Sequence, residues 1–501
     1  MKNLFRLRKL AFFAALFFAL TSCDDDGDFP GYNGSLDVPF YALEDGVRLT
    51  AFSAGNPQTP ASAAAITGLQ TGETILAIDF RPATGQLYGL GSTSRLYVLD
   101  PKTGAARPVG AGPFTPALAG TLAGFDFNPT VDRIRLVTST GQNLRLNPET
   151  GTVAATDGNI NGAAGASITA VAYTGNVSGS TTTTLYDIDA TSQKLYKQMP
   201  PNDGTLVEVG SLNLAISGDG GFDIAPDTDK ALALYNVGGK ATLFSVDLAT
   251  GKASIISVYN KAYTGIAIPT QPVAYAVSAT NNLLIFNPEK PATAIAKPIT
   301  GLASGETIVG IDFRPVNGQL YAVSSNSRVL TLNTSSGAAA VVATLSTPLV
   351  GTSFGVDFNP TVDRIRIVSN TGQNLRVNPA DGVTTVDGAL NPGTPAVTGA
   401  AYTNNFAGAT STTLYDLDVN TDKLYTQNPP NNGTLVEVGN LGVNVEAATG
   451  FDIGGASGTP YALLTSGGST KLYRINLNTG AATAVGDFNA SATGFALGLG
   501  F

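Results

Sequence analysis

Short runs of alternating apolar and polar residues, rich in β-branched and aromatic side chains, fill the chain from residue 38 to its end. One period shows the pattern, with runs at Ile75–Phe80, Gln86–Gly91, Arg95–Leu99 and Ala105–Val109. Such alternation is typical of half-buried strands, and no window beyond the first 22 residues carries a helical stripe. The pattern therefore predicts an all-β protein.

Turn signals divide this region into ten periods. Each signal is an Asn or Asp followed within a few residues by Gly or a polar residue, as in Asp100-Pro101-Lys102-Thr103-Gly104. Asn and Asp side chains form hydrogen bonds with the nearby backbone, and Gly adopts the left-handed conformation, so these residues favour turns. Their spacing of about 46 residues is that of β-propeller blades. The signals begin at Asn56, Asp100, Asn147, Asp189, Asp247, Asn287, Asn333, Asn378, Asp418 and Asn476.

The second half of the chain repeats the first. Gly72–Pro82 returns as Gly305–Pro315, and Phe125–Pro148 matches Val356–Pro379 at 19 of 24 positions. Four strands per period make one blade, so we expect two copies of five blades, over residues 38–270 and 271–501.

Ring closure distinguishes two five-bladed propellers from one ten-bladed propeller. The first period has only three strand-like runs before Glu73. Tyr263–Ile268 would supply the missing inner strand of the first copy, and Ala492–Leu497 that of the second. A closed ring hides strand edges that invite aggregation. We favour two separately closed rings, with the single ten-bladed ring as the alternative.

The repeated motifs resemble a known family. Ile-Asp-Phe-Arg-Pro, Asp-Phe-Asn-Pro-Thr-Val-Asp-Arg-Ile-Arg and Thr-Gly-Gln-Asn-Leu-Arg occur in both copies. With the Leu-Tyr-Asp and Asn-Gly-Thr-Leu elements, they resemble an uncharacterised bacterial family, domain of unknown function number 4394. The resemblance covers nearly all of residues 38–501, twice over. It implies an exported, repeat-built β domain and brings no catalytic or binding residues with it.

The amino terminus has the layout of an export signal. Residues 1–22 combine four cationic residues with an apolar run, Leu10–Leu20, too short for a spanning helix. Leu20-Thr21-Ser22-Cys23 resembles a bacterial lipoprotein cleavage box, which predicts lipid attachment at Cys23 and a membrane-anchored, exported protein in the outer membrane or at the cell surface. The alternative is an ordinary secretory signal with an incidental cysteine. Residues 23–37 form an acidic tether, which resembles a surface-export signal or is a plain spacer.

Composition excludes several function classes. The net charge of −9 becomes −13 without residues 1–22, so nucleic acid is not an expected partner. The absence of histidine removes Ser-His-Asp and Cys-His catalysis and His-ligated zinc. Any reaction would have to use carboxylates, Lys, Tyr, Ser, Thr or a hard cation.

Six aspartates are candidate channel-lining residues because they fall on predicted inner strands. They could surround a calcium ion, supply an acid/base pair, or bond turn amides and arginines as structural residues. They are Asp79, Asp126 and Asp223 in the first copy and Asp312, Asp357 and Asp452 in the second.

Two arginine pairs also require carboxylate partners. Arg133 and Arg135 are two residues apart on a predicted strand and share a face, as do Arg364 and Arg366. Their partners belong either to the neighbouring blade, in an inter-blade Arg–Asp network, or to an anionic ligand. We favour the network.

These observations favour a non-enzymatic binding or adhesion module displayed on the envelope, with a polysaccharide or protein ligand. Two alternatives stay open: a carboxylate-based enzyme acting on polysaccharide, and an envelope scaffold protein. No cofactor other than calcium is expected.

Overall fold

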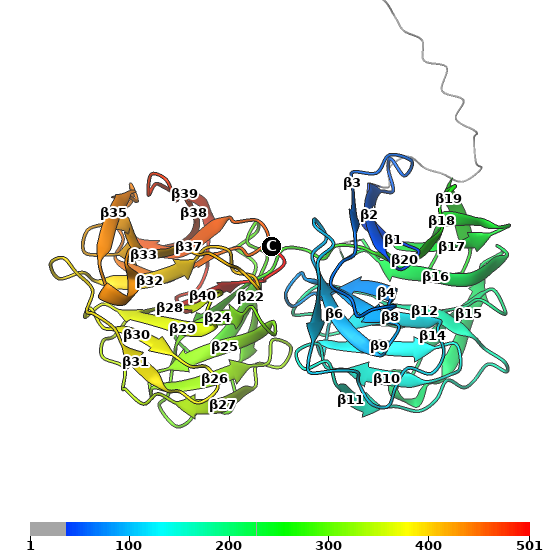
Figure 1. Ribbon diagram of the computed structural model, residues 1–501, viewed down its shortest axis with the longest axis horizontal. Helices are drawn as coiled ribbons and strands as arrows, with labels where there is room; N and C mark the ends of the chain where they lie inside the picture. Colours follow the sequence, from blue (N-terminus) through cyan, green and yellow to red (C-terminus); the bar gives the residue numbers. More distant parts are fainter. Residues whose placement is uncertain (1–36, 227) are drawn as a thin grey trace, which may run out of the picture.

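Ten four-stranded antiparallel sheets build the protein, in two rings that lie side by side (Figure 1). The computed structural model describes residues 37–226 and 228–501. The predicted signal, Cys23 and all of the tether except Asp37 lie outside the described residues. Over the described ranges, the only helices are the one-turn 3₁₀ helices η1 (Pro201–Asp203) and η2 (Pro430–Asn432). None of the described helices has the length and apolar character needed to cross a bilayer.

The first propeller consists of blades 1 to 5, each of which runs from an innermost strand at the hub to an outermost strand at the rim. Blade 1 is β20 (Tyr263–Ala267), β1 (Pro39–Glu44), β2 (Arg48–Ser53) and β3 (Ser62–Ala65). Blade 2 is β4 (Ile75–Phe80), β5 (Leu87–Gly91), β6 (Arg95–Leu99) and β7 (Ala106–Val109). Blade 3 is β8 (Ala123–Asn128), β9 (Arg133–Thr138), β10 (Asn143–Leu146) and β11 (Val153–Thr156). Blade 4 is β12 (Ile168–Tyr173), β13 (Leu185–Asp189), β14 (Lys194–Gln198) and β15 (Leu206–Ser211). Blade 5 is β16 (Ile216–Ile224), β17 (Ala231–Val237), β18 (Lys240–Val246) and β19 (Ala253–Val258).

The second propeller repeats this order in blades 6 to 10. Blade 6 is β40 (Ala492–Leu497), β21 (Ala274–Ser278), β22 (Asn282–Phe286) and β23 (Ile295–Pro298). Blade 7 is β24 (Ile308–Arg314), β25 (Gln319–Ser324), β26 (Arg328–Leu332) and β27 (Ala339–Thr344). Blade 8 is β28 (Phe354–Asn359), β29 (Arg364–Ser369), β30 (Asn374–Val377) and β31 (Thr384–Val386). Blade 9 is β32 (Val397–Tyr402), β33 (Leu414–Asp418), β34 (Lys423–Gln427) and β35 (Leu435–Asn440). Blade 10 is β36 (Ala447–Ile453), β37 (Pro460–Ser466), β38 (Ser469–Ile475) and β39 (Ala482–Asp487).

Each ring is closed by its own last strand. β20 pairs with β1, placing Ile266 opposite Ala42, and β40 pairs with β21, placing Phe495 opposite Ala276. The inner strands β4, β8, β12, β16 and β20 contact one another in turn, and β20 contacts β4. Strands β24, β28, β32, β36 and β40 do the same. The prediction of two five-bladed propellers is therefore confirmed, and the ten-bladed alternative is wrong.

Glycines on the inner strands let five blades approach closely at each hub. A Cβ on Gly124 of β8 would lie 2.6 Å from the amide nitrogen of Val171 on β12. A Cβ on Gly221 of β16 would lie 2.4 Å from the amide nitrogen of Ile266 on β20. Any side chain at these positions would therefore push neighbouring blades apart. The close packing leaves a central hollow of only about 10 Å³ in the first propeller, room for about one water molecule.

Apolar side chains fill the spaces between blades. The Tyr88 and Phe127 rings of blades 2 and 3 meet edge to face with centroids 5.1 Å apart. Tyr321 and Phe358 repeat the pair in blades 7 and 8 at 5.3 Å. The hydrophobic core of each propeller is thus a series of inter-blade layers, which leaves loops and blade edges as the accessible surface.

The two propellers share a polar interface. Arg81 Nη1 in the first propeller donates to the carbonyl oxygen of Gly318 in the second at 2.9 Å. The Tyr275 hydroxyl donates to the carbonyl oxygen of Ala83 at 2.9 Å. Because Arg81 is fully buried, this contact holds the rings together across a desolvated surface.

Candidate functional site

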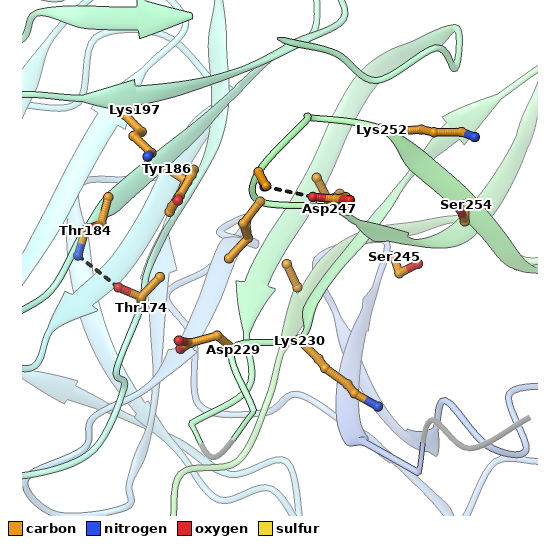
Figure 2. A pocket seen from close by; sticks show the side chains of 14 residues that line it. Thr174, Thr184, Tyr186, Lys197, Asp229, Lys230, Ser245, Asp247, Lys252 and Ser254 are labelled. Atoms are coloured by element: carbon orange, nitrogen blue, oxygen red, sulfur yellow. Dashed lines mark hydrogen bonds between the residues drawn. The ribbon is translucent and has the colours of Figure 1, made fainter. Parts of the chain in front are cut away.

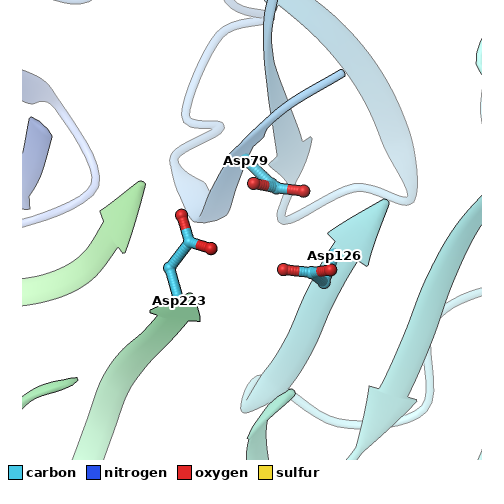
Figure 3. A group of neighbouring side chains, drawn as sticks. All are labelled: Asp79, Asp126 and Asp223. Carbon is cyan, nitrogen blue, oxygen red and sulfur yellow. The ribbon is translucent and has the colours of Figure 1, made fainter. Parts of the chain in front are cut away.

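Three aspartate carboxylates meet at the hub of the first propeller (Figure 3). Asp79, Asp126 and Asp223, which we name the hub triad, come from β4, β8 and β16, and one oxygen from each lies within 4.8 Å of the others. Asp312, Asp357 and Asp452 form the same cluster in the second propeller. The structure therefore brings all six sequence candidates to the two hubs. All six residues are about 1 % exposed, so their carboxylates are buried beside the channel rather than open to solvent.

Backbone amides occupy most of these carboxylate oxygens. Asp79 accepts hydrogen bonds from the amides of Phe80 and Phe127, both at 2.7 Å. Asp223 accepts from Ile224 at 2.6 Å and from Ile268, just after β20, at 2.5 Å.

The third carboxylate of each hub has fewer partners. Asp126 accepts from the Tyr173 amide on β12 at 3.0 Å, and Asp357 accepts from the Tyr402 amide at 3.2 Å. The Oδ2 atom of Asp357 is buried without a hydrogen-bond partner among the described residues. These carboxylates connect neighbouring blades, since each satisfies an amide on the inner edge of the next inner strand.

Burial and mutual repulsion raise the pKa values of the aspartates in these clusters. Burial raises the pKa of Asp79 well above its ordinary value, and the Asp223 carboxylate raises it further. Burial likewise raises the pKa of Asp126 well above its ordinary value, with further contributions from the other two aspartates. Burial raises the pKa of Asp223, and of Asp452 in the second hub, to about 7. Each hub thus carries less negative charge than three carboxylates would suggest.

The hub geometry bears on both chemistries that the sequence suggested. Ca²⁺ takes about six to eight oxygen ligands, whereas each hub brings one oxygen from each of three aspartates within 4.8 Å. A bound calcium ion would need further oxygens from elsewhere. An acid/base pair must reach its substrate, and these carboxylates are buried beside a hollow the size of one water molecule.

Arg135 lies in an inter-blade network. Its guanidinium donates to Asp157 at 2.6 Å and Asn143 at 2.7 Å. It also reaches blade 4, where it donates to Asn202 at 2.8 Å and the Tyr173 hydroxyl at 3.4 Å.

Arg366 repeats the network with Asp387, Asn374, Asn431 and Tyr402. Arg135 and Arg366 are about 1 % exposed, so their donors are used within the protein. Arg133 and Arg364 are half-buried and donate to the carbonyl oxygens of Asp132 and Asp363. The geometry favours the network over an anion pocket.

One further pair of buried carboxylates is absent from the sequence predictions. Asp187 on β13 and Asp416 on β33 are fully buried, and neither has a hydrogen-bond partner among the described residues. Burial raises the pKa of Asp416 to about 8 and that of Asp187 well above its ordinary value. These aspartates could have been found from the sequence, because both belong to the Leu-Tyr-Asp motif that recurs in the two copies.

A large open groove lies between blades 4 and 5 of the first propeller (Figure 2). Its volume is about 790 Å³. Lys197 on β14, Lys230 just before β17 and Lys252 just before β19 line it. We name it the lysine groove. Hydroxyl groups line the same walls, from Thr174, Thr184, Ser245 and Ser254.

The groove carries three lysine ammonium groups and two aspartate carboxylates, those of Asp229 and Asp247. The Lys197 ammonium lies 5.4 Å from the centroid of the Tyr186 ring, which supports it by a cation–π contact. Asp229 accepts a hydrogen bond from the Gly175 amide at 3.2 Å, and Asp247 accepts from Ala249 at 2.8 Å. The lysine–carboxylate ion pairs of the described residues leave the three groove lysines unpaired, since they involve Lys194, Lys261, Lys423 and Lys471.

Sequence reasoning missed this groove because its lysines come from three separate segments, which only blade packing brings together. A position-by-position comparison of the two copies would have marked these lysines as differences.

The repeat organisation agrees with a family match. The model of the family described as Domain of unknown function (DUF4394) matches residues 48–267 and again residues 282–497. The chain belongs to this family. A search of curated proteins finds no significant match. DUF4394 as described assigns no activity, so the function of this member has to be argued from its surface.

Two solved structures are similar at low sequence identity. The extracellular domain of BT4673 from B. thetaiotaomicron is 11% identical with a TM-score of 0.25, over 89% of this chain and 66% of that domain. This chain therefore spans slightly less than two thirds of its length. The Dos1 propeller is 11% identical with a TM-score of 0.26, over 67% of this chain and 91% of its own. At these values, neither likeness bears on function.

Proposed function

We propose that this DUF4394 protein is an exported, lipid-anchored envelope protein that binds a polymer of the cell surface or its surroundings without catalysing a reaction on it. The lysine groove carries the proposal. It is open, about 790 Å³ in volume, and lined by hydroxyls and ammonium groups. Groups of this kind hold a polar ligand through many weak hydrogen bonds.

Two further features support binding rather than catalysis. The six hub aspartates are buried, and each of them accepts at least one hydrogen bond from a backbone amide. A carboxylate-based glycosidase instead needs two carboxyls that flank an accessible cleft. The lipoprotein-like residues 1–23 would place the propellers outside the cytoplasm.

A retention experiment tests the proposal. The full chain, purified in detergent, is passed over immobilised envelope and matrix polysaccharides, and released reducing ends are measured in parallel. We expect retention on at least one polymer without release of reducing ends. Failure to retain any polymer would overturn the proposal, and steady release of reducing ends would favour the enzyme instead.

A further inference from the structure

The three groove lysines are specific to the first propeller. Lys197 lies opposite Tyr186 in the β13–β14 pair, and Thr426 lies opposite Tyr415 in the equivalent β33–β34 pair. The second propeller therefore has an uncharged residue where the first has an ammonium group.

The backbone hydrogen bonds fix the other two equivalences. The carbonyl oxygen of Lys230 accepts from Ala225, as that of Thr459 accepts from Gly454. The carbonyl oxygen of Lys252 accepts from Asp247, as that of Ala481 accepts from Asn476. Each lysine of the first propeller is thus replaced by a neutral residue at the same backbone position in the second.

At one position the second propeller has a cation where the first has a neutral residue. Arg474 on β38 occupies the position of Ser245 on β18, as the strand registers show. Arg474 donates to the Tyr461 hydroxyl at 3.1 Å and lies over that ring. The equivalent surface of the second propeller therefore has one aromatic-bound cation, with Gly458 and Asn476 in place of Asp229 and Asp247. The first propeller has three ammonium groups and two carboxylates there.

The arrangement of the lysines suits an extended ligand. Figure 2 shows the three amino groups spread along the groove and pointing in different directions rather than converging on one point. A small anion would need donors that converge on it, whereas a chain with repeated negative charges can contact all three in succession. The hydroxyls of Thr174, Thr184, Ser245 and Ser254 line the same groove and match the hydroxyl groups of a sugar chain.

The charge of the whole protein restricts where such a ligand binds. With 37 acidic and 28 basic residues, most of the surface repels a polyanion. The three unpaired groove lysines, beside Asp229 and Asp247 that each accept a backbone amide, are therefore the local cationic contacts for such a ligand.

We propose that the first propeller binds an acidic, uronic-acid-containing polysaccharide along the lysine groove, and that the second propeller does not. This inference rests on the proposed function and names its ligand class. Binding is non-covalent. The lysine ammonium groups form ion pairs with the carboxylates of the ligand, and the groove hydroxyls form hydrogen bonds with its sugar hydroxyls.

Polygalacturonate is the probe, and dextran is the neutral comparison. The test variant gives the first propeller the residues of the second, Lys197→Thr, Lys230→Thr and Lys252→Ala. The matched control removes the same charge from three exposed lysines elsewhere, Lys240→Thr, Lys261→Thr and Lys290→Thr. Lys240 and Lys261 line a second groove of about 480 Å³ between blades 5 and 1, so the control also tests that site. All three proteins are full-length and measured by titration at low and high salt.

We expect the wild-type and control chains to bind polygalacturonate, and the groove variant to bind about tenfold or more weakly, with a shallower salt dependence. An equal loss of affinity for polygalacturonate in both variants, or a loss of affinity in the control alone, would overturn the inference. Binding of dextran or another neutral polymer without polygalacturonate binding would overturn the inference and leave the proposed function standing. Binding of no polymer would overturn both.

Discussion

The Asp79 carboxylate on β4 accepts a hydrogen bond from the amide of Phe127 on β8 at 2.7 Å, joining two blades at the hub. Asp312 repeats this bond with Phe358 at 2.7 Å in the second propeller. Amides on the inner edge of an inner strand have no further strand to pair with, so a carboxylate is a fitting acceptor. The hub aspartates therefore have a structural role, because they join neighbouring blades through hydrogen bonds.

Protonation of buried aspartates, at the hubs and at Asp416 on β33, predicts an unusual pH dependence of stability. The pKa values of Asp223 and Asp452 are about 7 and that of Asp416 about 8 in the folded chain, against an ordinary value of 3.8. The folded state therefore keeps protons that the unfolded chain releases above about pH 4. Because folded pKa values are raised, their contribution is complete below about pH 4 and is lost as the pH rises to about 8.

Urea unfolding at several pH values measures this effect. We expect the free energy of unfolding to fall by a few kcal/mol, on the order of 2–5, between about pH 5 and pH 8. Glu306 has the opposite sign, since hydrogen bonds from Arg328 and Ser324 outweigh burial and lower its pKa to about 2. Its contribution is complete above about pH 4.5 and is lost as the pH falls to about 2. A stability that rises steadily from pH 5 to pH 8 would contradict the assignment of protons to the hubs.

Neutralising the least-bonded hub carboxylates should weaken this pH dependence. Asp126→Asn and Asp357→Asn keep the oxygen that accepts from Tyr173 or Tyr402, and remove one titrating carboxyl from each cluster. We expect the double variant to be more stable than wild type at pH 8 by about 1 kcal/mol or more, with little change at pH 5. Asp100→Asn, at an exposed turn, is the control and should change neither value. Destabilisation at both pH values would show that these side chains are needed as carboxylates.

Replacing Arg135, the centre of the inter-blade network, should lower the free energy of unfolding much more than replacing Arg133. Arg135→Met removes the buried cation beside Asp157, which keeps its two hydrogen bonds from Arg145, and it leaves Asn143, Asn202 and the Tyr173 hydroxyl without their guanidinium donor. We expect a loss of about 3–5 kcal/mol in unfolding free energy. Arg133→Met, two residues away and half-buried, should cost about 1 kcal/mol or less. Similar losses for the two variants, measured by urea unfolding, would argue against the network.

The interface between the propellers provides an internally matched pair of arginines. Arg81 pairs with Asp132, and their side chains are 1% and 6% exposed, whereas the equivalent Arg314–Asp363 pair is 19% and 29% exposed. Of these two arginines, Arg81 donates to the other propeller, at Gly318, whereas Arg314 donates to Asp363 and Tyr321 within its own. We expect Arg81→Ala to cost about 3–5 kcal/mol and Arg314→Ala about 1 kcal/mol or less. Calorimetry of the two variants should also show the melting transitions of the propellers separating for Arg81→Ala alone. Equal effects of the two substitutions would contradict this role of the interface.

Local sequence patterns were sufficient for the fold. The strand predicted at Ile75–Phe80 is β4, and the predicted closing strand Ala492–Leu497 is β40, because alternation and turn chemistry are local properties. The hub position of Asp79 followed from its place on an inner strand, but its burial depended on how closely five blades pack. The groove lysines could not be found in this way, since Lys197, Lys230 and Lys252 approach one another only through the packing of blade 4 on blade 5.

Hydrogen exchange with and without polygalacturonate is the most direct measurement of the groove's role. It is recorded on the full chain at a saturating concentration of the polymer. We predict protection confined to residues 174–197 and 229–254, which surround the lysine groove. Protection of the equivalent residues 403–426 and 458–483 of the second propeller instead, or no protection in either segment pair despite binding, would contradict this role.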